Sequence, residues 1–218
     1  MPDLSPAQQS RAVRELLASH GRTYADEAGI RLRDTPQPLY RLLVLAVLLS
    51  ARIRSTTAVA TARALYDAGL RDPRRMRAAS WQERVDALGS GGYRRYDERT
   101  ATQLGDGAAL LIEEYGGDLR RLRAEADGDV AALRGLLRRT PGLGPAGVDI
   151  FLREVQGVWP EAAPYLDAKT LDGARRLGLP DDPIRLAKLA RAAGESDLAV
   201  LAAALVRTAL EKPSVGGE

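Results

Sequence analysis

The sequence predicts an all-α protein. Apolar residues recur every three or four positions in most segments, helix start and stop signals recur along the chain, and no segment alternates apolar and polar residues as a strand does. Of 218 residues, 45% are hydrophobic and 28% are charged. This composition is ordinary for a folded protein with a sizeable core. We therefore expect about ten short helices and no sheet.

In the first half of the chain, helix starts are marked by capping residues. Ser5, followed by Pro6 and Gln8, is a capping-box pattern, and Gly21 ends that helix. After a loop, residues 39–51 are apolar almost all round, which indicates a central buried helix. Further starts are predicted at Ser55, at Asp72 before Pro73, and at Ser80, where Glu83 completes a second capping box.

The second half of the chain shows the same kinds of helix start and stop signals. An amphipathic helix runs from Leu104 to Tyr115 and stops at two glycines, and Trp159-Pro160 breaks the chain later. The last three helices are predicted to begin at Asp167, at Asp182 before Pro183, and at Ser196, with a frayed tail from about residue 212.

Residues 136–155 predict two helices joined by a tight turn. The turn Pro141-Gly142-Leu143-Gly144 contains glycines that can adopt positive φ, and Pro145 suits the first turn of a helix. The N–H groups that begin the second helix would point outward, where such groups bind phosphate. This pattern describes a helix-hairpin-helix, a backbone clamp for DNA. A plain αα-hairpin with a glycine turn fits the stretch equally well.

Composition excludes several kinds of chemistry. The sequence has no Cys, which excludes disulfides, thiolate catalysis and iron–sulfur clusters. Its one His, His20, argues against a Ser-His-Asp triad and a His-rich metal site. The net charge of +3 permits nucleic-acid binding. The longest apolar run, residues 42–49, is far short of the roughly 18 residues that span a bilayer. Without a signal-peptide pattern, we expect a cytoplasmic protein.

Four elements in order carry a family resemblance over about residues 36–179. They are Leu48-Leu49-Ser50-Ala51 at the end of the apolar helix, Gly92-Tyr93 before a basic run, the hairpin Pro141–Gly144, and Tyr165-Leu166-Asp167. Together they resemble the endonuclease III branch of the helix-hairpin-helix (HhH-GPD) DNA glycosylases.

The resemblance implies two helical lobes with DNA and a flipped base between them. Residues 38–158 would form a six-helix barrel that contains the hairpin, and residues 1–37 with 159–218 would form the second lobe. The expected partner is double-stranded DNA with a damaged or mismatched base, bound by a monomeric protein associated with the nucleoid.

The resemblance also implies a catalytic residue. Asp167 lies where the family has its catalytic aspartate, and a carboxylate there would stabilise the oxocarbenium-like state of the sugar. Bifunctional members carry a nucleophilic lysine at the position of Ala146, and four cysteines for an iron–sulfur cluster; this chain has neither. We therefore expect a monofunctional enzyme that hydrolyses the N-glycosidic bond. The alternative for Asp167 is a plain N-cap. Lys169 is either a solvated surface lysine, a phosphate contact or a displaced amine nucleophile.

DNA contacts are predicted at three places. By family position, Arg52, Tyr93 and Arg94 would fill the gap left by the flipped base, although Tyr93 reads equally well as a half-buried loop aromatic. The remaining candidates are the hairpin residues Gly142, Leu143, Gly144, Ala146 and Gly147, and the arginines Arg95, Arg99, Arg138 and Arg139 as phosphate contacts or solvated charges.

Cofactors and rival functions complete the expectations. Apart from a K⁺ or Na⁺ ion that the family binds near Gly142 and Gly144, no cofactor is expected. The rivals are a non-catalytic helix-hairpin-helix DNA-binding protein, a lyase that uses Lys169, and a helical protein unrelated to DNA.

Overall fold

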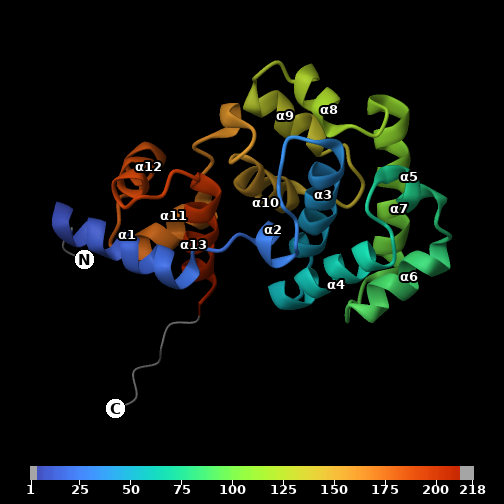
Figure 1. The fold of residues 1–218 in the computed structure, drawn as a ribbon, viewed down its shortest axis with the longest axis horizontal. Helices are drawn as coiled ribbons and strands as arrows, with labels where there is room; N and C mark the ends of the chain where they lie inside the picture. The colour runs from blue at the N-terminus through green and yellow to red at the C-terminus, as the bar shows by residue number, and fades with distance from the viewer. Residues whose placement is uncertain (1–3, 212–218) are drawn as a thin grey trace, which may run out of the picture. The chain divides into compact units, whose positions relative to one another are not determined.

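The structure, a computed structural model, describes residues 4–211 (Figure 1). Within this range it contains thirteen α-helices, one 3₁₀-helix and no strand, so the prediction of an all-α fold is confirmed. No helix in the described range is long and apolar enough to cross a membrane. The predicted tail from about residue 212 lies outside the described residues.

The chain forms two compact units. Unit 2 comprises residues 24–162, and unit 1 combines the described residues up to Thr23 with those from Ala163 onward. A lobe made from both ends of the chain was expected. Residues 24–37 and 159–162, which were expected in that lobe, belong to unit 2 instead.

The reason is a long-range contact made by Glu154. Its two carboxylate oxygens accept the N–H groups of Tyr24 and Ala25 at 3.1 and 2.9 Å, and its side chain is buried. These bonds satisfy two N–H groups at the start of a short helix. They tie the segment from Tyr24 onward to the body of unit 2.

Unit 2 is described in full, and six of its helices have eight or more residues. They are α3 (Pro36–Ser50), α4 (Ser55–Asp67), α6 (Trp81–Ser90), α7 (Asp97–Tyr115), α9 (Val130–Leu137) and α10 (Pro145–Val155). Shorter elements are α2 (Tyr24–Glu27), α5 (Pro73–Ala78), α8 (Leu119–Glu125) and the 3₁₀-helix η1 (Pro160–Ala162).

Helix α3 is the centre of unit 2. Nine of its 15 residues are buried, as its nearly uniform apolar sequence predicts. Helices α4 and α10 pack against it, and α10 lies beside it in Figure 1. The helix ends because Ala51 has an extended backbone, with ψ 158°. The loop that contains Arg52 therefore begins directly after Ala51.

Two helices of unit 2 were not predicted. The segment expected to be a loop before Thr35 contains α2, and α8 follows Asp118, whose carboxylate accepts the N–H of Arg120. Helix α2 has only four residues, and its N-terminal N–H groups are satisfied by Glu154 from far along the chain. No local signal could have indicated it.

Unit 1 contains α1 (Pro6–His20), α11 (Ala168–Arg176), α12 (Pro183–Ala192) and α13 (Leu198–Leu210). Helix α13 is buried along most of its length and packs against α1 and α11. At Gly173 of α11, a Cβ atom would lie 2.0 Å from the carbonyl oxygen of Leu205, so only glycine permits this close packing. Helix α13 is capped by Asp197 rather than beginning at Ser196, because Asp197 accepts the N–H of Ala199.

Candidate functional site

The glycine turn between α9 and α10 forms the predicted hairpin. Gly142 has φ +84°, which L side chains rarely adopt, and Leu143 donates its N–H to the carbonyl oxygen of Thr140 at 3.0 Å. The Leu143 side chain is only 2% exposed. The turn is therefore anchored inward by Leu143 while its backbone stays at the surface.

Both ends of the turn pack closely against other helices. A Cβ on Gly142 would lie 3.1 Å from Gln103 Oε1 and 3.2 Å from Val47 Cγ1, which belong to α7 and α3. A Cβ on Gly147 would lie 2.8 Å from Leu143 Cδ1 and 3.4 Å from Ser50 Cβ. The hairpin is thus held rigidly on the core of unit 2.

Helix α10 begins without a side-chain cap. Its N-cap is Gly144, Pro145 at the first helical position has no N–H, and no side chain accepts from the N–H groups of Ala146 and Gly147. Residues 144–146 are exposed. Gly147 is buried, so the start of α10 presents the uncapped N–H of Ala146 and the positive end of the helix dipole at the surface.

Most other helices of the described range have a side-chain cap at their N-terminus. Helices α3, α4 and α7 share with α10 an N-cap residue whose side chain accepts no capping hydrogen bond. Eight helices have an acceptor side chain at the N-cap, namely Ser5, Asp72, Ser80, Asp118, Asp129, Asp167, Asp182 and Asp197.

In unit 1, Asp167 is the N-cap of α11. Its Oδ1 accepts the N–H of Thr170 at 3.1 Å, and its carbonyl oxygen accepts the Thr170 hydroxyl at 2.7 Å. The interpretation of Asp167 as an N-cap is confirmed. The carboxylate is half-buried, and these two bonds hold it at the positive end of α11.

Lys169, the candidate amine nucleophile two residues after Asp167, gains no support from its surroundings. The Lys169 ammonium lies 3.7 Å from Asp172 Oδ2 in an ion pair whose side chains are 42% and 38% exposed. Such pairs are common on surfaces and weak. Ala146, at the family's lysine position, is exposed near the start of α10 and presents only a methyl group.

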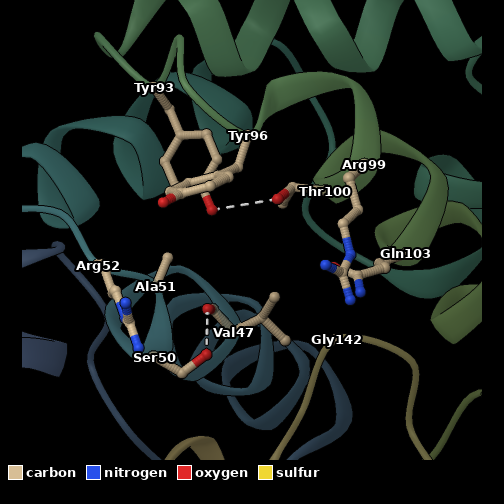
Figure 2. Close-up of a pocket in the computed structure, with 10 residues that line it drawn as sticks. All are labelled: Val47, Ser50, Ala51, Arg52, Tyr93, Tyr96, Arg99, Thr100, Gln103 and Gly142. Carbon is tan, nitrogen blue, oxygen red and sulfur yellow. Dashed lines mark hydrogen bonds between the residues drawn. The ribbon is translucent and has the colours of Figure 1, made fainter.

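Unit 2 contains a cavity of about 310 Å³ between the end of α3, the start of α7 and the hairpin (Figure 2). Arg52 and Tyr93, both predicted from the sequence, are among the residues that line it. The Tyr93 side chain is only 2% exposed, and its hydroxyl lies 3.1 Å from Thr100 Oγ1. Burial raises the pKa of Tyr93. Its ring is more deeply buried than either interpretation of the sequence anticipated.

The remaining lining residues of α7 follow helical spacing. Tyr96 is the N-cap of α7, and Arg99, Thr100 and Gln103 follow it at helical spacing on one face of the helix. Only Arg99 was named from the sequence. The spacing was visible there, but only the fold shows that this face borders a cavity.

The predicted phosphate contacts fall into two groups. Arg94, Arg95 and Arg138 are exposed and make no ion pair with described residues. Arg139, in contrast, pairs with Glu114 at 2.6 Å. The unpaired guanidinium groups are the better candidates for binding an anion.

Three carbonyl oxygens of the hairpin, where the sequence predicts a K⁺ or Na⁺ ion, accept no backbone hydrogen bond in the described range. They are those of Pro141, Gly142 and Leu143, whereas that of Gly144 accepts the N–H of Val148 at 3.0 Å. Carbonyl oxygens are ligands for K⁺ and Na⁺. Among residues 4–211, no three His, Cys, Asp or Glu side chains gather as a metal site.

Comparison with known proteins relates this geometry to one fold. No protein-family model matches the chain. No curated protein matches it either. Two solved structures of endonuclease III with DNA do align with it, each at 18% sequence identity over 93% of this chain and 85% of the other. One is a trapped covalent intermediate with an estranged adenine, with a TM-score of 0.53, and the other is a non-covalent complex, with a TM-score of 0.55.

The fold is that of endonuclease III. At this identity the likeness shows the fold alone, so the function has to be argued from the residues.

Proposed function

We propose that this protein is a DNA glycosylase that flips a damaged or mismatched base out of duplex DNA and hydrolyses its N-glycosidic bond. The observation that carries the proposal is the exposed, uncapped start of α10 at a glycine hairpin, in a chain with the fold of endonuclease III. The endonuclease III structures are DNA complexes, which supports DNA as the partner. The protein acts as a monomer.

The hairpin binds the DNA backbone. The N–H of the exposed residue Ala146 donates to a phosphate, and the dipole of the 11-residue helix α10 favours its negative charge. The exposed guanidinium groups of Arg52, Arg94 and Arg138 add attraction that does not depend on sequence. A K⁺ or Na⁺ ion on the hairpin carbonyls would reinforce this attraction by placing positive charge beside the phosphate.

Asp167 performs the chemistry. As the bond between C1′ and the base breaks, its electron pair leaves with the base and positive charge develops on the sugar. The carboxylate stabilises that charge and orients a water molecule. The water adds to C1′ and gives up a proton, and the departing base gains one. The products are a free base and an abasic site.

The enzyme is monofunctional. A lyase step needs an amine that attacks C1′ and forms a Schiff base, and the methyl group of Ala146 cannot do this. Borohydride should therefore trap no covalent protein–DNA adduct. An adduct lost in Lys169→Gln would instead identify a lyase that uses Lys169.

The test is base release from a panel of lesion duplexes, with wild type beside Asp167→Asn. We expect the wild type to release at least one base and the variant to release it far more slowly. A second candidate, a DNA-binding module without catalysis, is supported by the same hairpin, because the clamp on α10 does not involve Asp167. Salt-sensitive duplex binding without base release from any lesion would establish that candidate instead.

A further inference from the structure

The cavity of about 310 Å³ in unit 2 is lined by basic side chains and by no acidic ones. Ten residues line it, and its charged side chains are Arg52 and Arg99, with no carboxylate among the ten. In Figure 2 these two arginines lie on opposite sides of the cavity, Arg52 in the loop after α3 and Arg99 on α7. The walls therefore present positive charge and hydrogen-bond donors without a matching acid.

Three hydroxyl groups of the wall are engaged in hydrogen bonds, but the longer polar side chains are not. Ser50 donates to the carbonyl oxygen of Val47 at 2.7 Å, and the Tyr93 hydroxyl pairs with Thr100. Arg52, Arg99 and Gln103 make no hydrogen bond or ion pair with described residues, although all three line the cavity. Their donors and the Gln103 carbonyl are available to a ligand.

The volume of the cavity and one of its walls suit a single nucleobase. A volume of about 310 Å³ lies at the lower end of the range for small-ligand pockets. Tyr96 is half-buried and lines the cavity on the same side as Tyr93 (Figure 2). The Arg95 guanidinium lies 5.3 Å from the centroid of the Tyr96 ring. The opposite face of an aromatic ring can stack on any nucleobase. A single unstacked base therefore fits both the size and the chemistry.

The guanidinium groups can distinguish the four bases by their hydrogen-bond acceptors. A guanidinium is donor-only and forms its best bonds with two neighbouring acceptors. Guanine has such a pair in O6 and N7, and an unpaired cytosine has one in O2 and N3. Adenine and thymine alternate donors and acceptors along their edges and have no such pair.

We propose that this cavity receives an unstacked guanine or cytosine, and that Arg99 is the residue that selects it over adenine and thymine. The proposal rests on the proposed function, because a glycosylase must unstack bases. The base is either the one being excised or its partner on the opposite strand.

The test measures binding of the full-length protein to four short duplexes that differ only in one unpaired base. Fluorescence anisotropy at a single salt concentration should show guanine and cytosine duplexes bound about tenfold tighter than adenine and thymine duplexes. A parallel set carries a tetrahydrofuran abasic analogue opposite each of the four bases. The same preference in both sets identifies the partner base as the occupant, and a preference in the first set alone identifies the extruded base. Equal affinity for all four bases in both sets would overturn the proposal.

Two variants distinguish recognition of the base from general electrostatic attraction to DNA. Arg99→Lys keeps the positive charge but loses the bidentate hydrogen-bond donor of the guanidinium. The preference for guanine and cytosine should therefore disappear, while the overall affinity for duplex DNA changes little. Arg74→Gln removes an exposed arginine of α5 that does not line the cavity, and it should keep the preference. A preference that survives in Arg99→Lys would contradict the assignment.

The outcome is independent of catalysis. A base preference without base release from any lesion would refute the proposed function and leave this site standing. Base release without a preference would refute the site alone.

Discussion

Helices α10 and α11 begin in opposite ways. At α10 the N-cap is Gly144, which has no side-chain acceptor, and residues 144–146 are exposed. At α11 the N-cap is Asp167, whose carboxylate accepts the N–H of Thr170. Both ends carry the same positive partial charge from the helix dipole.

The comparison shows that the positive N-terminal end of a helix can have two different roles. A helix start without an acceptor keeps its N–H groups for an external anion such as phosphate. A helix start with its own carboxylate neutralises part of that charge and holds an anion in a defined place, where it can face a developing cation. In the proposed enzyme, the first arrangement binds DNA and the second carries out hydrolysis.

The largest effect should follow from removing the charge at α11. Asp167→Asn keeps an N-cap that is about as good as aspartate, so the stability of the fold should change little. Base release should fall by at least about 100-fold, because the carboxylate no longer stabilises the cationic state. Single-turnover base release measures this.

Asp182→Asn is the matched control, because Asp182 caps α12 in the same way by accepting the N–H of Arg185. It should retain wild-type activity. Equal losses in both variants would mean that Asp167 acts only as a cap.

A third helix start extends the comparison, because the N–H groups of α2 are capped from a distance by Glu154. Burial raises the pKa of Glu154 from 4.5 to about 7. Between these values the native protein keeps a proton that the unfolded chain has lost. The free energy of unfolding should therefore fall as pH rises from 4.5 to 7, by roughly 3 kcal/mol from this group.

Urea unfolding across that range measures the slope. Glu154→Gln should flatten it, whereas Glu98→Gln, at an exposed glutamate of α7, should leave it unchanged. An unchanged slope in Glu154→Gln would show that Glu154 titrates near its ordinary pKa.

Converting the start of α10 into a capped one should weaken DNA binding moderately. A Cβ on Gly144 meets no atom within 4 Å and the residue has φ −72°, so a side chain fits. Gly144→Asp should reduce duplex affinity about tenfold, within the range of helix-dipole interactions, while adding about 0.3 kcal/mol of stability. Anisotropy titration and urea unfolding measure the two effects.

Gly144→Asn provides the comparison, since it caps the helix without adding charge, and its loss of affinity should be smaller. If Gly144→Asp bound duplex as tightly as wild type, the hairpin would not be a phosphate clamp.

The smallest effect is expected at Lys169. Its ion pair with Asp172 is largely exposed, so Lys169→Gln should change stability by less than about 1 kcal/mol. Base release should remain near the wild-type rate. A large loss of release would instead place the amine in the reaction.

Local signals in the sequence predicted much of the fold. The capping boxes of Ser5 with Gln8 and of Ser80 with Glu83 are both present, and Gly142 has the positive φ expected of the hairpin. These features were readable because a cap or a tight turn joins residues three or four apart. The backbone near each residue determines them almost alone.

Other features of the molecule were decided by tertiary structure. Glu154 caps α2 across 130 residues, and Tyr93 is buried against α7 rather than exposed in its loop. Gln103 and Gly142 border one cavity because the hairpin packs on α7. The sequence alone therefore determined where helices begin and where a hairpin turns. Which side chains share a cavity, or lose their contact with water, depends on how distant helices pack, because burial is a property of the assembled core.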